Sequence, residues 1–251
     1  QGRYLNWDYD EDRELILKGK LPIESGMLVL DEIHKYPRWR QLVKGIFDKH
    51  HDKLHILVTG SAKLDYYRRG GDSLQGRYRF LRLHPLSFKE VAEKTNDQEK
   101  LLRLLDHSGF PEPFWENIPS EVKIWSRDYR VKLIREELQD LEKVSEISLL
   151  ERLNLRLPEL VGNPLSINSL REDLQVSHQT VTRWIELLER LYGLFRVYPL
   201  ASNRTRAVKK EAKHYHFDWT VVDDPGARFE NLIACHLLKW SHWQYDALGE
   251  D

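Results

Sequence analysis

Two adjacent carboxylates at the end of an apolar run are the residues best suited to chemistry. The run is Met27-Leu28-Val29-Leu30, and Asp31 and Glu32 follow it directly. Four consecutive apolar residues are typical of a parallel strand buried on both faces, and ligands bind at the carboxyl edge of such sheets. Asp31 could hold Mg²⁺, while Glu32 could orient a water molecule and take its proton. The pattern favours hydrolysis of a nucleoside triphosphate, and a buried strand that merely ends in charge is the alternative.

A second apolar run with a polar end strengthens this interpretation. Leu54-His55-Ile56-Leu57-Val58 precedes Thr59-Gly60-Ser61, and a stretch typical of a helix comes before it. The hydroxyl groups of Thr59 and Ser61 could contact a γ-phosphate or the attacking water, and Gly60 allows a sharp turn. An ordinary turn after a strand would use the same residue types.

A third run, Arg79-Phe80-Leu81-Arg82-Leu83, predicts another strand. Pro85 should end this strand, and Ser87 with Glu90 has the pattern of a capping box at the start of a helix. Arg77 lies just before the run, and its guanidinium group could reach a γ-phosphate as a catalytic cation. A surface ion pair is the alternative role for Arg77.

In order and spacing, these segments resemble a widespread prokaryotic family of AAA-type ATPases. The resemblance rests on LVLDEIHKYPRW, ILVTGSAKL and GDSLQGRYRFLRLHPLSFKE, with SGFPE and RFEN further along, and it runs from about Tyr4 to the C-terminus. It implies a P-loop α/β domain with a Walker B strand that ends at Asp31 and Glu32 and a sensor 1 residue at Thr59. A winged-helix domain and often a nuclease-like tail follow in that family. ATP and Mg²⁺ are the implied cofactors.

The phosphate-binding loop of that family has no counterpart in this sequence. A Gly-rich turn ending in Gly-Lys-Thr or Gly-Lys-Ser should precede the Walker B strand, whereas the segment Tyr4-Leu5-Asn6-Trp7-Asp8 already resembles the family's second strand. We therefore expect the chain to start inside the ATPase domain. Because the loop supplies the amides and the lysine that bind phosphate, these 251 residues alone should turn over little or no ATP.

A second group of motifs predicts a winged helix-turn-helix. Residues 166–174 are typical of a helix, residues 175–177 of a tight turn, and residues 178–192 of a second helix with Ser177 as its N-cap. The strands of the wing are expected at 194–200 and 214–217. The inward stripe of the second helix should consist of Val181, Trp184, Ile185, Leu188 and Leu191.

The exposed start of the second helix and the basic wing could bind DNA. Helix residues would reach the major groove and wing residues would contact phosphates. The candidates are His178, Gln179, Thr180 and Arg183 on the helix, and Arg204, Arg206, Lys209, Lys210 and Lys213 on the wing. Winged helices also bind proteins, so the expected partners are a nucleotide and either double-stranded DNA or a protein.

The composition restricts the class of protein further. With 41% apolar and 31% charged residues the chain can build ordinary cores, and a net charge of −1 gives no overall attraction to nucleic acid. The one cysteine, Cys235, excludes an internal disulfide framework. The neighbouring His50, His51 and His55 lack an obvious fourth ligand for zinc. No apolar run is long enough to span a membrane, so we expect a cytoplasmic protein.

The predicted fold is α/β: an N-terminally truncated P-loop AAA-type parallel sheet, followed by a mostly helical region with the winged helix-turn-helix. The expected parts are a partial ATPase domain at 1–95, a helical lid or linker at 96–160, the winged-helix domain at 161–220 and the start of a nuclease-like region at 221–251. The last part ends too early to show a nuclease centre.

Two functions remain open at this point. The first is an ATP-dependent switch or motor with the winged helix as its output. The second is a DNA-binding or protein-binding module whose ATPase portion is incomplete or degenerate.

Within the helical region, a long helix is expected from Ser120, and Trp115 is expected to pack in a core rather than against a nucleotide.

Overall fold

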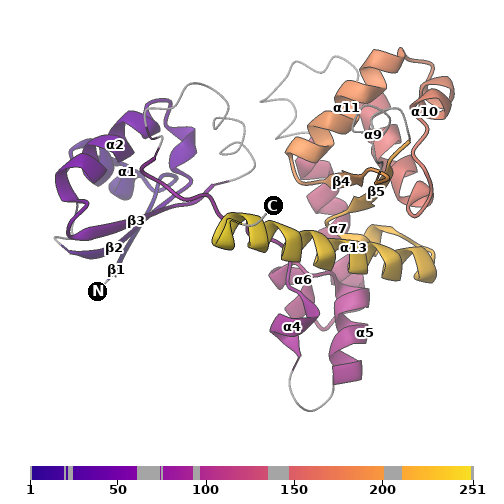
Figure 1. The fold of residues 1–251 in the computed structure, drawn as a ribbon, viewed down its shortest axis with the longest axis horizontal. Coiled ribbons are helices and arrows are strands. Elements are labelled where there is room, and N and C mark those ends of the chain that lie inside the picture. The colour runs from indigo at the N-terminus through magenta and orange to yellow at the C-terminus, as the bar shows by residue number, and fades with distance from the viewer. Residues whose placement is uncertain are drawn as a thin grey trace. The chain divides into compact units, whose positions relative to one another are not determined.

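The computed structural model divides the chain into two compact units, Gln1–Arg79 and Phe80–Asp251. It describes residues 2–19, 21, 25–60, 74, 76–92, 97–134, 147–200 and 211–249. The first unit contains a parallel sheet, and the second is mostly helical (Figure 1). Within the described residues, no helix has the length and apolar character needed to cross a membrane.

The first unit is built on three parallel strands in the order β1-β2-β3. These strands are β1 (Gly2–Asn6), β2 (Gly26–Asp31) and β3 (Leu54–Val58). Helix α1 (Asp10–Leu17) lies between β1 and β2, while the 3-10 helix η1 (Ile33–Lys35) and helix α2 (Trp39–His50) lie between β2 and β3. The two apolar runs of the sequence therefore form strands, as predicted, and the structure makes these strands neighbours in the sheet.

Both helices pack on the same face of the sheet, and the opposite face stays open (Figure 1). The packed face carries Leu5, Leu28 and Leu30, all fully buried against side chains of α1 and α2. On the open face, Tyr4, Met27 and Leu57 keep 52%, 48% and 46% of their surface exposed. The prediction that the strand at residues 27–31 is buried on both faces was therefore wrong, because no described element covers the second face.

The second unit contains a helical body and a two-stranded antiparallel sheet. The helices of its first half are α4 (Phe88–Val91), α5 (Asp97–His107), α6 (Pro111–Trp115) and α7 (Pro119–Lys132). After them come α9 (Ile147–Arg156), η3 (Leu157–Leu160), α10 (Ile167–Leu174), α11 (His178–Arg190), β4 (Leu194–Val197), β5 (Lys213–His216) and η4 (Trp219–Val221). The long helix α13 (Pro225–Trp243) continues into the π-helix η5 (Gln244–Leu248).

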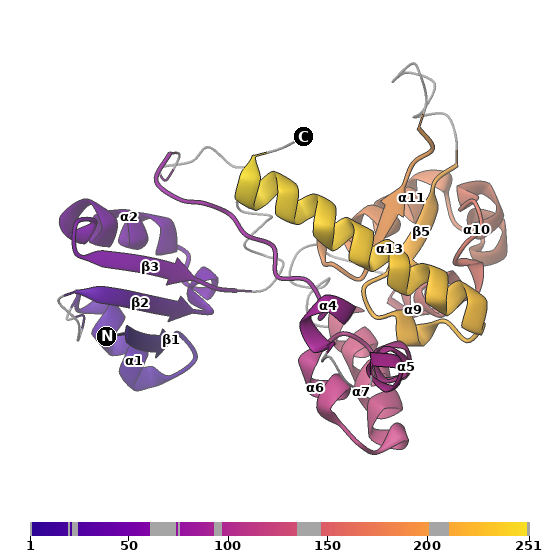
Figure 2. The same ribbon diagram turned by 60° about the horizontal axis from the view of Figure 1, so that its bottom comes forward.

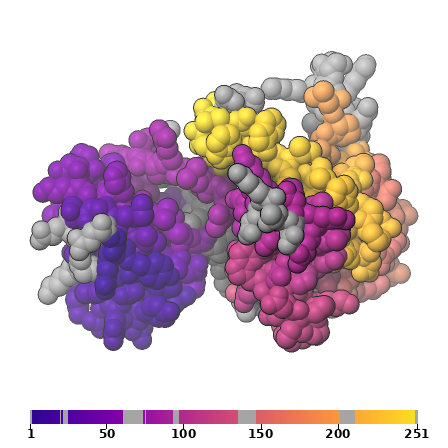
Figure 3. All heavy atoms as spheres, turned by 90° about the horizontal axis from the view of Figure 1, so that it is seen from below, coloured from indigo at the N-terminus to yellow at the C-terminus, as the bar shows by residue number. Residues whose placement is uncertain are grey.

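Helix α13 shares one core with elements from both halves of this unit. Trp219, Leu104 and Leu232 are buried there together with Val91 and Phe114. In the space-filling view, α13 (yellow) lies against the magenta helices of the first half (Figure 3). The predicted long helix near Ser120 is confirmed as α7, and the predicted link between Ser87 and Glu90 is confirmed by a hydrogen bond of 2.7 Å from the Ser87 amide to Glu90 Oε2.

Trp115 does not pack in this core. Its side chain is 63% exposed, so the prediction of a buried role was wrong. The cause is local, because the preceding residue of the short helix α6, Phe114, is buried instead and packs in the core.

The predicted strand at Arg79–Leu83 is also wrong, since residues 78–87 form neither helix nor strand. Arg82 instead makes a bidentate ion pair with Asp246: Nε lies 2.8 Å from Oδ2, and Nη2 lies 2.7 Å from Oδ1. His84 Nε2 lies 2.8 Å from His242 Nδ1. The alternation of arginine and leucine has the pattern of a strand, but the side chains of Arg82 and His84 attach the segment to η5 and to the end of α13. Figure 2 shows the backbone of this segment passing beside that helix.

Gly109 fills a position where any side chain would collide with its neighbours. A Cβ atom there would lie 2.5 Å from the Trp219 ring and 2.8 Å from the carbonyl oxygen of Leu86. The Leu86 amide also donates to the Gly109 carbonyl at 2.6 Å, which holds the two segments together. The SGFPE motif therefore contains a packing requirement of the second unit.

We predict that Gly109→Ala lowers the free energy of unfolding of the second unit by about 1–3 kcal/mol, because the new methyl group overpacks the core. Gly45→Ala in α2 is the matched control, since a Cβ at this helical position meets nothing within 4 Å. The control should stabilise the first unit by about 0.5–1 kcal/mol. Chemical denaturation followed by circular dichroism measures both effects. Equal stability of wild type and Gly109→Ala would contradict the packing argument.

Candidate functional site

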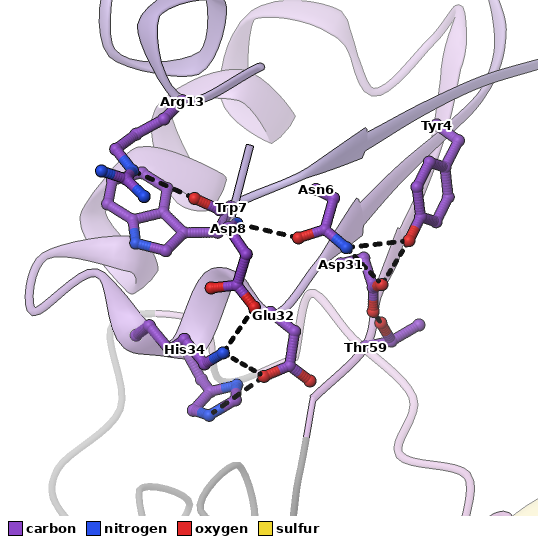
Figure 4. Close-up of polar contacts among 10 residues, drawn as sticks. Tyr4, Asn6, Trp7, Asp8, Arg13, Asp31, Glu32, His34 and Thr59 are labelled. Atoms are coloured by element: carbon purple, nitrogen blue, oxygen red, sulfur yellow. Dashed lines mark hydrogen bonds and ion pairs between the residues drawn. The ribbon is translucent and has the colours of Figure 1, made fainter. Parts of the chain in front are cut away.

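The ends of the three parallel strands bring three polar side chains to one edge of the sheet. Asn6 pairs with Asp31 in the register of β1 and β2. Leu30 pairs with Val58 in the register of β2 and β3, so Thr59 lies beside Asp31. Figure 4 shows Asn6, Asp31 and Thr59 converging at this edge, together with Tyr4 from the open face. Two of the predicted site residues, Asp31 and Thr59, are therefore in direct contact.

Asp31 accepts hydrogen bonds on both oxygens of its carboxylate. The Thr59 hydroxyl donates to Oδ1, and the Tyr4 hydroxyl donates to Oδ2. The Asn6 side-chain amide lies 3.2 Å from Oδ2 and also donates to the Tyr4 hydroxyl at 3.1 Å. Burial alone would raise the pKa of Asp31, but the hydrogen bonds from Thr59 and Tyr4 outweigh it and hold this pKa below its ordinary value. Asp31 is therefore a carboxylate at neutral pH.

Glu32 points away from Asp31 and into a separate ion pair. Its backbone is left-handed, with φ of 55°, which is uncommon for a residue other than glycine and recurs at functional sites. Its Oε2 lies 3.1 Å from Lys35 Nζ, and Lys35 Nζ also lies 2.6 Å from Asp8 Oδ2. Burial would lower the pKa of Lys35, but Asp8 and Glu32 together raise it. Lys35 is thus a permanent cation between two carboxylates.

Asn6 links the two halves of the site. Its side-chain nitrogen donates to Asp31, while its side-chain oxygen accepts a hydrogen bond of 2.8 Å from the Asp8 amide. The neighbouring Trp7 stacks on Tyr36 with ring centroids 4.9 Å apart. The end of β1 and the residues just after it therefore position both the partner of Asp31 and the partner of Lys35 (Figure 4).

The donor set at this edge fits a hard divalent cation. Carboxylate and hydroxyl oxygens are the ligands that Mg²⁺ prefers, and Asp31 and Thr59 supply one of each. Mg²⁺ commonly binds to one or two carboxylates and completes its shell with water and substrate phosphates. Within the described ranges, no group of three or more His, Cys, Asp and Glu side chains is placed to hold a metal.

Arg77, the predicted catalytic arginine, makes an ion pair with a residue of α2. Arg77 Nε lies 3.3 Å from Asp48 Oδ1 in α2, so the structure shows Arg77 in an ion pair. Ser61 lies outside the described residues. The catalytic roles of Arg77 and Ser61 stay predictions.

Four contributors to the site were not predicted from the sequence: Tyr4, Asn6, Asp8 and Lys35. Each of them contacts a predicted residue or its direct partner. For Asn6 a usable signal was present, because polar residues at the end of one parallel strand should meet those at the end of its neighbour. Lys35 carries a weaker signal, since only the tight η1 turn returns it to Glu32.

The second predicted constellation lies on α10, α11 and the sheet β4-β5. Ser177 is the N-cap of α11, and its Oγ accepts a hydrogen bond of 3.0 Å from the Thr180 amide. Gln175, with φ of 55°, makes the turn between the helices. The predicted inward stripe is confirmed, because Val181, Trp184, Ile185, Leu188 and Leu191 are all buried.

The predicted DNA-contacting residues are only partly described. His178, Gln179 and Arg183 are exposed on α11, and Thr180 is half-buried. Lys213 begins β5 and donates a hydrogen bond of 3.0 Å to Glu230, which also accepts one of 2.7 Å from the Tyr215 hydroxyl. Arg204, Arg206, Lys209 and Lys210 lie outside the described residues.

Comparisons with known proteins agree with the first part of the sequence analysis. Residues 2–92 match the sequence model of a family described as an AAA domain, and residues 98–222 match a family described as a domain of unknown function. The AAA match supports an AAA-type, nucleotide-binding domain in the first part of the chain. No solved structure matches the chain.

Relatives with similar sequences occur in bacteria and archaea, and each is named only as an uncharacterised protein. The one from Haemophilus influenzae is 24% identical, over 91% of this chain and 62% of the relative. One from Mycobacterium tuberculosis is 22% identical, over 76% of this chain and 42% of the relative. One from Methanocaldococcus jannaschii is 23% identical, over 85% of this chain and 54% of the relative. The chain therefore spans roughly half the length of these relatives.

We predict that Asp31→Asn lowers the pKa of Tyr4 toward its ordinary value near 10. The hydrogen bond to the Asp31 carboxylate is the main cause that raises this pKa, and a neutral amide accepts more weakly. A raised pKa means that the bond stabilises the fold below pH 10 and that this contribution is lost as the pH rises through the folded-state pKa. NMR titration with ¹³C-labelled tyrosine measures it.

The control for this experiment is Asp52→Asn, which removes an exposed carboxylate elsewhere in the same unit. The control should leave the Tyr4 titration unchanged. An unchanged titration in Asp31→Asn as well would show that Tyr4 does not donate to Asp31 in solution.

Proposed function

We propose that the first unit is the catalytic part of an AAA-type ATPase, in which ATP hydrolysis drives a nucleotide-dependent switch or motor. The observation that carries this proposal is the contact between Asp31 and Thr59 at the carboxyl edge of a parallel sheet, with Glu32 next in the chain. The AAA-domain match over the same residues supports it independently. The winged helix is the proposed output, and a cytoplasmic location is proposed with it.

In this mechanism the two adjacent carboxylates have different tasks. Asp31, held ionised by its donors, would bind Mg²⁺ directly or through water, and the ion would supply positive charge against the developing charge on the phosphates. Glu32 would accept the proton of the attacking water, with Lys35 holding the Glu32 carboxylate near the strand end. Thr59 would orient the water or the γ-phosphate through its hydroxyl.

The sequence contains no Gly-Lys-Thr or Gly-Lys-Ser loop, so the phosphate cradle is not among the residues described here. The first unit nevertheless has the free surface that such an element needs. β3 is at the edge of the described sheet, and Tyr4, Met27 and Leu57 expose an apolar face beside Asp31. A strand and helix carrying the loop could extend the sheet at β3 and cover that face.

We predict that Glu32→Gln, in a form of the protein that hydrolyses ATP, lowers kcat on the order of 100-fold or more while ATP binding persists. The amide keeps the shape of the side chain but cannot act as a base. Release of radiolabelled phosphate measures turnover, and fluorescence of a labelled nucleotide measures binding. Glu14→Gln in α1 is the control for a lost surface carboxylate, because Glu14 is paired with Lys18 at 2.6 Å. An undiminished rate in Glu32→Gln would remove Glu32 from the mechanism.

A DNA-binding or protein-binding module with an incomplete ATPase portion is the second candidate function. It is favoured by the start of α11, where His178, Gln179 and Arg183 are exposed. A helix N-terminus with such side chains, followed by a basic segment, has the chemistry for major-groove and phosphate contacts.

The test of this candidate is a triple variant, Lys209→Ala, Lys210→Ala and Lys213→Ala. It should weaken duplex DNA binding for all sequences, and each lost phosphate contact should reduce the slope of log K against log salt by about 0.9. A control variant, Lys18→Ala, Lys49→Ala and Lys123→Ala, removes the same charge from exposed sites on helical segments elsewhere. Fluorescence anisotropy at several salt concentrations measures both. Wild-type protein without salt-sensitive binding would leave protein contact as the role of this region.

A further inference from the structure

The carboxylate proposed to bind the cation is already engaged by hydrogen-bond donors. Tyr4 and Asn6 both donate to Asp31 Oδ2, and Thr59 donates to Oδ1. A hydroxyl hydrogen and a divalent cation need the same lone pairs on a carboxylate oxygen, so they compete for it. Binding of a cation at Oδ2 therefore requires at least one donor to leave.

Of these donors, Tyr4 is the one that can leave at the smallest cost. Its side chain is 52% exposed on the open face of the sheet, so rotation of the ring removes little surface from a core. Its departure also breaks the exposed hydrogen bond of 3.1 Å that the Tyr4 hydroxyl accepts from Asn6, which water can replace. Departure of Asn6 would instead break the hydrogen bond of 2.8 Å between its side-chain oxygen and the Asp8 backbone amide. Thr59 does not need to leave, since its hydroxyl oxygen is itself a suitable ligand and can stay beside a bound cation.

We infer that Tyr4 controls the access of a divalent cation to Asp31. In the cation-free site the Tyr4 hydroxyl holds Oδ2, and it swings onto the open face when a cation binds. Tyr4 is thus a positioning residue that acts through Asp31 and lowers the affinity of the site for a free cation. This inference rests on the proposed role of Asp31 as the Mg²⁺ ligand.

The experiment uses Mn²⁺ as a paramagnetic probe of the 251-residue chain. Selective broadening of the backbone amide signals of Glu32 and Thr59 reports binding at the sheet edge, and its concentration dependence gives the Kd. Tyr4→Phe keeps the ring and removes the competing donor, so it should bind Mn²⁺ roughly three- to tenfold more tightly than wild type. Asp31→Asn should abolish the selective broadening in both backgrounds.

Tyr9→Phe is the matched control, because Tyr9 belongs to the same unit and its side chain is 63% exposed. It should bind Mn²⁺ with the affinity of wild type. The amide spectrum of Tyr4→Phe, unchanged away from the sheet edge, verifies that the fold is kept.

The outcomes separate this inference from the proposed function. If binding depends on Asp31 but is equal or weaker in Tyr4→Phe, the role of Tyr4 is overturned and the role of Asp31 stands. If neither wild type nor Tyr4→Phe shows binding that depends on Asp31, both roles are overturned. Tighter binding in Tyr4→Phe, lost again in the double variant with Asp31→Asn, supports the inference.

Discussion

The parallel register of β1, β2 and β3 decides where the side chains that surround Asp31 lie. Side chains alternate between the faces of a strand, so Tyr4, Asn6 and Asp31 share the open face while Leu5, Leu28 and Leu30 share the packed one. A slip by one residue would move the Asp31 carboxylate into the apolar core beneath α1 and α2. An unpaired charge there is strongly unfavourable, so the burial that stabilises the unit also holds the site in place.

The same geometry separates two carboxylates that are neighbours in sequence. Asp31 ends the strand and meets uncharged donors, whereas the left-handed backbone at Glu32 turns its side chain toward the ammonium group of Lys35. Adjacent carboxylates in one environment would repel each other and compete for the same partners. Here each has its own partners, and Asn6 connects the two sets through Asp31 and the Asp8 amide. The site is therefore one network with two distinct chemical environments.

The sequence was sufficient for features that depend on local pattern. The strands at β2 and β3, the Ser177 N-cap and the buried stripe of α11 all follow from short-range composition. It was insufficient where a distant partner decides, as at Arg82, whose pairing with Asp246 overrides a strand-like pattern. Tyr4 and Asn6 were not assigned to Asp31, because that contact depends on which strands are neighbours. The boundary between the two units is another such feature. The AAA-domain match extends to residue 92, whereas the structure assigns the residues from Phe80 onward to the second unit.

The attachment of residues 82–88 to α13 has a consequence for how the chain folds. Arg82 and His84 find their partners 164 and 158 residues later, and the Phe88 amide donates to a histidine 148 residues later. Contacts at such separations close long loops and form late, which slows folding. During synthesis on a ribosome, residues 82–88 therefore cannot form these native contacts until α13 and η5 have been synthesised. Until α13 emerges, Leu86 and Phe88, which pack against the core that α13 completes, lack part of their native surface and are available to chaperones.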